Sequence, residues 1–159
     1  MCGIVGLFLK DASLKPALGA LLTDMLVTMT DRGPDSAGIA IYSDAVQGAV
    51  KLTLQSATPA KHFNGLKESL ASQLDGPVQL LTRDTHAVLS IDATQLDAAR
   101  AALHKPVPDV RVLSAGESIE VYKEVGRPEA VAARFELNKM SGSHGIGHTR
   151  MATESAVTT

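Results

Sequence analysis

The chain begins with MCGIVGLFL, residues 1–9, a short apolar segment whose second residue, Cys2, is the only cysteine of the protein. Removal of the initiator methionine would leave Cys2 as the N-terminus, with a thiol and a free α-amine on one residue. An α-amine has a reference pKa of roughly 7.7–8.0, so it can accept the thiol proton as a general base. Cys2 is therefore a candidate nucleophile. A free cysteine is more often a small buried hydrophobe, and from Cys2 alone this second interpretation is favoured.

The first third of the chain predicts two strands around a helix. Residues 4–9 are short and apolar, which predicts a buried strand. Apolar residues then recur at helical spacing and predict a helix that ends near Thr30. The apolar face of this helix consists of Leu18, Leu21, Leu22, Met25, Leu26 and Met29. Residues 38–42 predict a further strand, and we expect residues 46–54 to pair with it.

The middle of the chain predicts a separate small layer of strands and helices. Its expected elements are a helix at 60–74, a strand at 85–91, a helix at 94–104, a strand pair at 110–113 and 118–123, and a helix at 128–137. We expect a two-layer αβ subdomain at residues 57–140, inserted into a core formed by residues 1–56 and 141–159. Within that core, residues 141–150 predict a glycine-rich loop that leads into a short strand.

Composition excludes several classes of function. The 159 residues are 45% hydrophobic, carry a net charge of −2, and contain only 3% aromatic residues without tryptophan. Basic patches and aromatic stacking platforms are therefore absent from the pattern, which argues against nucleic acids and anionic membranes as partners. One cysteine fits a reducing compartment, and residues 4–9 are too short for a signal or spanning helix. We expect a soluble, cytoplasmic protein.

Two arginines stand in segments that suit a binding site. Arg32 lies in a charged turn at residues 31–36 and could form a bidentate contact to a substrate carboxylate. The alternative is a turn with an internal Arg–Asp pair, which is the favoured interpretation of the turn by itself. Arg150 ends the C-terminal strand, and a guanidinium with a buried stem there could also recognise a carboxylate. An ordinary strand-end arginine is an equally good interpretation.

The histidines do not predict a metal site. His144 and His148 are four residues apart, but the glycines around them argue against a helix. In a strand, at about 3.3 Å per residue, the two side chains would be roughly 13 Å apart. We expect His62, His86 and His104 to be surface or helix-end residues, and we expect no metal and no cofactor.

Three segments of the chain, taken together, resemble the class II glutamine amidotransferases. They are MCGIVG at residues 1–6, RGPDSAG at 32–38 and GIGHTRMAT at 145–153. Each segment is weak alone, but their order and the cysteine at position 2 make a specific signal. Within this family, the end of the chain resembles glutamate-synthase-like glutaminase subunits, including those paired with N-methylglutamate synthase.

The resemblance implies a fold and a reaction. The fold would be an α+β, N-terminal-nucleophile αββα sandwich, and the reaction would be hydrolysis of glutamine to glutamate and ammonia through a Cys2 thioester. The ammonia would pass to a synthase subunit or domain, and we expect an oligomer. Carried over by position, Arg150 would bind the glutamine α-carboxylate, Thr153 would assist it, and Arg32 would shape the pocket.

The sequence departs from the family pattern in several places. The inserted subdomain separates Arg32 from Arg150 more than in compact members, and Met151 stands where an aromatic residue is frequent. The family's Asn-Gly pair, which supplies the oxyanion hole, and a later Asp that receives the substrate α-amine are not found after Thr153. Loss of one oxyanion donor typically lowers turnover by about 10²–10³. We therefore expect the N-terminal part of a glutaminase domain, inactive or poorly active alone.

Two other functional interpretations stay open. The chain could be a regulatory or assembly subunit that keeps the fold without turning over glutamine. Separately, residues 57–140 could sense a ligand or mediate oligomerisation.

Overall fold

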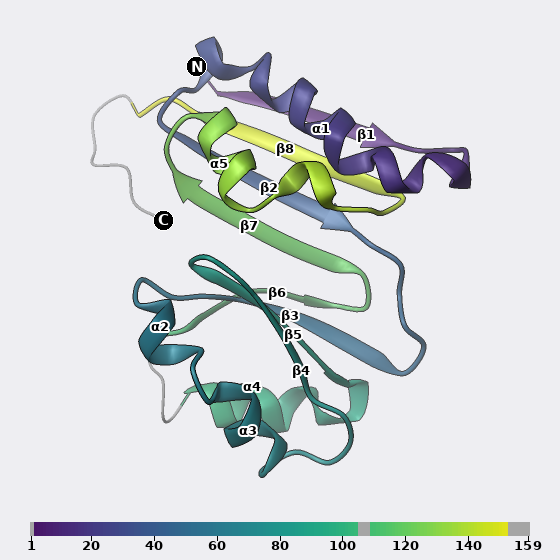
Figure 1. Ribbon diagram of the computed structural model, residues 1–159, viewed down its shortest axis with the longest axis vertical. Helices are drawn as coiled ribbons and strands as arrows, with labels where there is room; N and C mark the ends of the chain where they lie inside the picture. Colours follow the sequence, from purple (N-terminus) through teal and green to yellow (C-terminus); the bar gives the residue numbers. More distant parts are fainter. Residues whose placement is uncertain (1, 105–108, 153–159) are drawn as a thin grey trace. The chain divides into compact units, whose positions relative to one another are not determined.

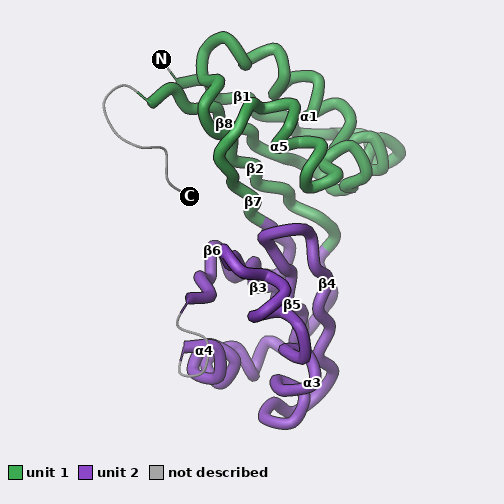
Figure 2. The backbone as a smooth tube through the Cα atoms, turned by 60° about the vertical axis from the view of Figure 1, so that its left-hand side comes forward, with its two compact units in different colours: residues 1–44, 121–159 green, residues 45–120 purple. Residues whose placement is uncertain are grey.

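The computed structural model describes residues 2–104 and 109–152, which form an α+β structure with two four-stranded sheets (Figure 1). The chain divides into two units (Figure 2). Unit 1 comprises Met1–Asp44 and Val121–Thr159, and unit 2 comprises Ala45–Glu120. Each unit has its own sheet and its own buried core.

Unit 1 is built on a sheet with the strand order β1-β8-β2-β7. Its elements are β1 (Gly3–Phe8), the 3-10 helix η1 (Ala12–Ala17), α1 (Leu18–Val27), η2 (Thr30–Arg32), β2 (Ser36–Tyr42), β7 (Ile119–Val125), α5 (Pro128–Arg134), η4 (Leu137–Lys139) and β8 (His144–Arg150). The central strand β8 is antiparallel to both β1 and β2. The first and last strands of the described residues, β1 and β8, therefore lie side by side.

Helix α1 covers one face of this sheet. Leu18, Leu22 and Leu26, spaced four residues apart, are completely buried, and each such side chain stabilises the fold by about 2 kcal/mol. A Cβ added at Gly147 of β8 would lie 2.8 Å from Cδ1 of Leu26, so glycine lets the helix approach the strand closely. The predicted apolar face is wider than the observed one, because Leu21 is 41% exposed.

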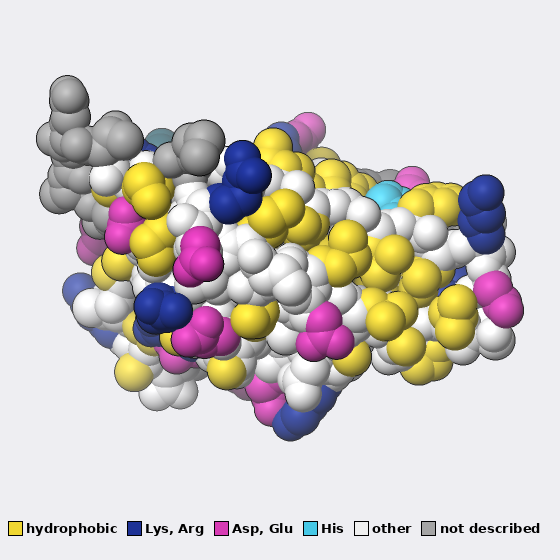
Figure 3. All heavy atoms as spheres, turned by 90° about the horizontal axis from the view of Figure 1, so that it is seen from above, with side chains coloured by type: hydrophobic (Ala, Val, Ile, Leu, Met, Phe, Trp, Pro, Cys, Tyr) yellow, Lys and Arg dark blue, Asp and Glu magenta, His cyan; other side chains and the backbone are white. Residues whose placement is uncertain are grey.

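The opposite face of the unit 1 sheet is apolar and exposed. Strand alternation places Ile4, Phe8 and Ile146 on this face, and they are 70%, 67% and 44% exposed. Figure 3 shows that hydrophobic side chains are exposed in several places on the surface that it draws. The expected strand at residues 4–9 therefore forms, but only one of its faces is buried.

Unit 2 contains the sheet β4-β5-β3-β6, in which each strand is antiparallel to its neighbours. Its elements are β3 (Ala49–Gln55), α2 (Pro59–His62), α3 (Leu66–Ala71), β4 (Gln79–Arg83), β5 (His86–Asp92), η3 (Ala93–Gln95), α4 (Leu96–His104) and β6 (Arg111–Gly116). Leu52 and Leu89 from the sheet pack in one core with Leu70 of α3 and Leu103 of α4. The helices therefore cover one face of this sheet.

Two of the predicted strand pairings are wrong. Residues 46–54 do not pair with β2, because β3 lies between β5 and β6. Residues 110–113 and 118–123 do not pair with each other, because β6 and β7 belong to different sheets. Both predictions joined strands that are close in sequence, whereas the pairing here is set by contacts between distant segments.

The helix predicted at residues 60–74 is interrupted. Helix α2 ends at His62, and Gly65, with a left-handed φ of +72°, precedes α3. Phe63, Leu66, Leu70 and Leu74 still face the unit 2 core, so the amphipathic pattern was identified correctly.

The boundaries between the two units differ from the boundaries of the insertion predicted at residues 57–140. Strand β3 belongs to unit 2, and residues 121–140 belong to unit 1. The reason is that β7 lies beside β2, and that α5 packs on α1 with Val131 and Ala132 buried. Residues 121–140, predicted as the end of the insertion, thus complete the unit 1 sheet and its helical layer.

Candidate functional site

Cys2 and Arg150 come from the same end of the unit 1 sheet. In the antiparallel pair of β1 and β8, Gly3 lies opposite Thr149. Continuing this register by one residue brings Cys2 opposite Arg150, on the face that carries Ile4. Cys2 is exposed, so the interpretation of this cysteine as a core residue is wrong. Met1 and Thr153, the other residues expected here, lie outside the described residues.

The charged turn at residues 31–36 lies at the same end of the unit 1 sheet, because Ser36 pairs with β8. In the pairing of β2 with β8, Ser36 lies opposite Arg150. Pro34 forms an isolated parallel bridge to Arg150, and the amide of Asp35 donates to the Arg150 carbonyl at 3.1 Å. The RGPDSAG and GIGHTRMAT segments are therefore joined directly, although more than a hundred residues separate them.

Gly33 lies against the backbone of Arg150. A Cβ at this position would be 2.5 Å from the Arg150 nitrogen and 2.6 Å from the Thr149 carbonyl carbon. No side chain fits there without moving the strand, because real Cβ atoms do not approach backbone so closely. Gly33 thus sets how closely the turn and the end of β8 approach each other.

Asp35 ties the turn to the residues after β8. Its Oδ2 accepts a hydrogen bond of 2.7 Å from the backbone amide of Ala152. A carboxylate that accepts from a backbone amide makes a strong, charge-assisted bond. Sequence reasoning noted this aspartate only as part of a turn, since its partner lies 117 positions away.

Arg32 is exposed at the end of η2. Within the described part of the chain, no ion pair joins its guanidinium to Asp31 or Asp35, so the internal Arg–Asp pair is not observed. Its charge is therefore available to a ligand at the same end of the sheet. The contribution of Arg32 to binding stays a prediction.

Arg150 is also exposed, as the last residue of β8, while its neighbour Thr149 is completely buried. The Thr149 hydroxyl donates to the carbonyl of Met29 at 3.4 Å, which holds the strand end against the segment after α1. The backbone of Arg150 is therefore fixed, and its side chain extends from a rigid position.

The histidines of β8 lie on the exposed face of the unit 1 sheet. The ring of His144 stacks on Tyr42 at a centroid distance of 4.0 Å and lies 5.6 Å from the ring of Phe8. His148 is exposed, opposite Ile4. Among residues 2–104 and 109–152, no group of three or more His, Cys, Asp or Glu side chains could hold a metal ion.

One of the other histidines differs from expectation, and a second is more buried than its position at a helix end suggests. His86 is completely buried in β5, and His62 ends α2 as expected but is only 9% exposed. His62 Nδ1 lies 2.7 Å from the hydroxyl oxygen of Ser56. Polar side chains with hydrogen-bond partners are tolerated in the interior, and the sequence pattern did not reveal those partners.

Comparison with known proteins identifies two relatives, while no family model matches the chain. The chain resembles proteins named as glutamine amidotransferases. It is 59% identical over its full 159 residues to the glutamine amidotransferase-like protein GlxB of Rhizobium meliloti (strain 1021). It is 32% identical, over 99% of its length, to a putative glutamine amidotransferase of Methanothermobacter thermautotrophicus. The chain spans 52% and 54% of these relatives, about half of their length.

One further observation concerns helices that could span a membrane. Within the described residues, no helix combines the length and the hydrophobicity needed to cross a membrane.

Proposed function

We propose that this chain forms the N-terminal part of a class II glutamine amidotransferase domain, in which Cys2 attacks the side-chain amide of glutamine. The observation that carries this proposal is the strand register at the end of the unit 1 sheet, where Gly3 and Ser36 flank Thr149 and Arg150. The names of the two relatives support a glutamine amidotransferase in general.

The proposed chemistry begins with transfer of the Cys2 thiol proton to the α-amine that removal of Met1 exposes. The thiolate attacks the amide carbon, ammonia leaves with the proton, and a γ-glutamyl thioester remains. Water then hydrolyses the thioester and releases glutamate. Arg150 would hold the substrate α-carboxylate, Thr153 would support it, and Arg32 would contribute positive charge beside them.

We also propose that the exposed face of the unit 1 sheet packs against a second sheet in an αββα sandwich. Ile4, Phe8 and Ile146 support this proposal, because contiguous exposed apolar side chains on a sheet usually mark a face that another layer covers. In the complete assembly, the ammonia would pass to a synthase subunit or domain in the cytoplasm.

Labelling with a glutamine analogue tests the proposed nucleophile. The analogue carries an electrophilic diazoketone in place of the side-chain amide, and the adduct is located by mass spectrometry. We expect one adduct on Cys2 of chains that have lost Met1, and protection by excess glutamine. Cys2→Ser should abolish the adduct. An adduct elsewhere, or retention of Met1, would contradict the proposal and favour a non-catalytic regulatory or assembly role.

The role of Arg150 is tested in the same assay. Arg150→Lys keeps the charge but loses the two-pronged contact, so at limiting reagent we expect labelling about tenfold slower. Arg100→Lys is the matched control, because Arg100 is an exposed arginine of α4 in unit 2. Equal labelling rates in the two variants would show that Arg150 does not bind the substrate.

A further inference from the structure

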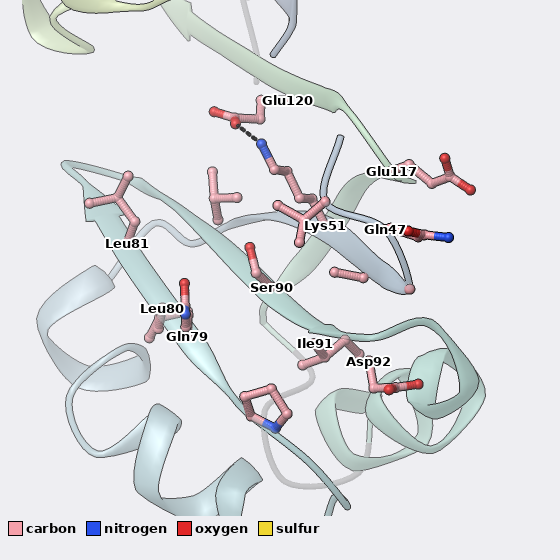
Figure 4. A pocket seen from close by; sticks show the side chains of 15 residues that line it. Gln47, Lys51, Gln79, Leu80, Leu81, Ser90, Ile91, Asp92, Glu117 and Glu120 are labelled. Atoms are coloured by element: carbon pink, nitrogen blue, oxygen red, sulfur yellow. Dashed lines mark hydrogen bonds and ion pairs between the residues drawn. The ribbon is translucent and has the colours of Figure 1, made fainter. Parts of the chain in front are cut away.

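Strand β4 forms one edge of the unit 2 sheet, since within the described residues it pairs only with β5. Three of its five side chains are exposed, and those of Leu80 and Arg83 are half-buried. The strand borders a pocket of about 670 Å³, and Figure 4 shows Leu81 at the side of this pocket opposite to Glu117. The edge of β4 is therefore accessible to another strand.

The features that usually protect an exposed edge strand are missing from β4. Residues 79–82 contain no charged residue and no proline, and the register of β4 with β5 runs without a shift. Such features matter because an unprotected edge pairs readily with other chains. The other edge of the same sheet, β6, begins with Arg111 and has an irregular register with β3. Of the two edges of this sheet, β4 is thus the one suited to strand pairing.

The hairpin geometry shows which backbone groups of β4 point outward. A turn of two residues, Asp84 and Thr85, joins β4 to β5, and Arg83 lies opposite His86. In a hairpin with such a turn, the flanking pair is hydrogen-bonded, and hydrogen-bonded and non-hydrogen-bonded pairs then alternate. The N–H and C=O groups of residues 80 and 82 are therefore directed away from β5, toward the free edge.

A second copy of the chain supplies an antiparallel strand that matches this edge. When Leu81 lies on the two-fold axis, the outward groups of Leu80 meet those of Thr82 in the second copy, and all five residues of β4 have a partner. Gln79 then lies opposite Arg83 of the second copy. The two like charges of Arg83 are thus kept apart, which avoids an unfavourable cross-strand pair.

The same register covers an exposed apolar side chain. Leu81 is 53% exposed and lies opposite Val88 of β5. On the two-fold axis it meets Leu81 of the second copy in a non-hydrogen-bonded pair, in which facing side chains are closest. A continuous row of four apolar side chains, two leucines between two valines, then crosses the paired sheets. Removal of Leu81 from water favours the association.

We propose that two copies of this chain associate through antiparallel pairing of their β4 strands, which joins the two unit 2 sheets into one sheet of eight strands. An edge of five residues is smaller than the roughly 800 Å² per partner of a standard interface, so we expect a weak dimer with a Kd of about 10–100 μM. This inference assigns an oligomerisation role to unit 2 and does not rest on the proposed chemistry of Cys2.

Sedimentation equilibrium of the 159-residue chain, from about 5 to about 500 μM, tests the proposal. Leu81→Lys places two ammonium groups opposite each other, and we expect it to weaken the dimer at least about tenfold. Val112→Lys is the matched control, because Val112 is a 39% exposed apolar residue of β6, at the other edge of the same sheet. Circular dichroism checks that both variants fold.

Disulfide trapping tests the register in a Cys2→Ser background, which removes the only natural thiol. Leu81→Cys places two thiols on the two-fold axis with Cα atoms about 4.5 Å apart, a separation that a disulfide spans. Thr82→Cys is the control on the same strand, because its two copies are diagonal neighbours about 7–8 Å apart. We expect Leu81→Cys to form disulfide-linked dimers at least about tenfold faster.

The proposal is overturned if the chain stays monomeric at the highest concentration, or if Leu81→Lys and Val112→Lys have equal effects. Equal trapping of Thr82→Cys and Leu81→Cys would contradict the register. A dimer weakened only by Ile4→Lys would belong to the exposed face of unit 1 instead. Labelling of Cys2 is an independent readout that Leu81→Lys should leave unchanged, so failure of the dimer proposal and failure of the glutaminase proposal are distinguishable.

Discussion

At the scale of single residues, the close approach of Gly33 to Arg150 is the most restrictive feature of the candidate site. Gly33 and the strand end meet through backbone atoms. Any side chain at position 33 must displace either the turn or the Arg150 backbone. The position of the guanidinium thus depends on a residue that itself carries no chemistry.

We expect Gly33→Ala to destabilise the chain by about 1–3 kcal/mol, the usual cost of inserting a methyl group into a packed region. It should also slow labelling of Cys2 by the glutamine analogue. Gly6→Ala is the matched control, because a Cβ at Gly6 would meet nothing within 4 Å. Denaturant unfolding measures the stability of both variants, and equal stability would show that the strand end yields to the added methyl group.

At the scale of elements, an aspartate begins the helical segment that follows β5. Oδ1 of Asp92 accepts hydrogen bonds from the backbone nitrogen and the hydroxyl of Thr94, at 2.9 and 2.6 Å. These bonds, first that of the Thr94 side chain and then that of its backbone, lower the pKa of Asp92 below its usual value of 3.8. Only the charged carboxylate is stabilised in this way.

The sign of the pH dependence follows from this lowered pKa. The stabilisation by Asp92 is fully present above pH 3.8 and is lost as the pH falls through the lower pKa of the folded state. We expect Asp92→Asn and Thr94→Val each to flatten the fall of the melting temperature over that acidic range. Melting curves at a series of pH values measure the slope, and an unchanged slope in both variants would refute this role.

At the scale of the whole molecule, the protein has two separate cores. Leu22 of α1 is completely buried in unit 1, and Leu89 of β5 is completely buried in unit 2. Each unit has a sheet with helices on one face, so each has the elements that a folding domain requires.

We expect Leu89→Ala to destabilise unit 2 by about 2–5 kcal/mol, because the truncation leaves a cavity in a closed core. Hydrogen exchange should then become faster in β3, β4 and β5 than in β1, β2 and β8. Leu22→Ala should produce the reverse pattern. Faster exchange throughout the chain in both variants would show instead that the two cores unfold as one cooperative unit.

Local sequence patterns predicted most of the individual elements. The apolar run after Cys2 forms β1, the leucine spacing forms α1, and residues 85–91 and 94–104 correspond closely to β5 and to η3 with α4. These predictions succeed because hydrophobic periodicity reflects which face of an element is buried. The pattern did not reveal β4, whose side chains are mostly exposed and therefore carry little of that signal.

The candidate site was predicted in part. Motif order placed Cys2, Arg32 and Arg150 together, and the strand register brings Cys2 and Arg150 to one end of a sheet. The contacts that hold this end, from Gly33 to the Arg150 backbone and from Asp35 to Ala152, were not predicted. Neither was the unit 2 pocket, because its lining comes from four separate segments of the chain.

The sequence by itself thus determined most of the kinds of element, which follow from residue type and local spacing. The order of its three motif segments identified Cys2, Arg32 and Arg150 as candidate site residues. Only the tertiary structure showed that β3 belongs to the unit 2 sheet, that β7 belongs to the unit 1 sheet, and that His86 is buried. It also decided that the thiol end of β1 is exposed beside Arg150. Strand pairing and burial depend on complementary surfaces of distant segments, which no local pattern contains.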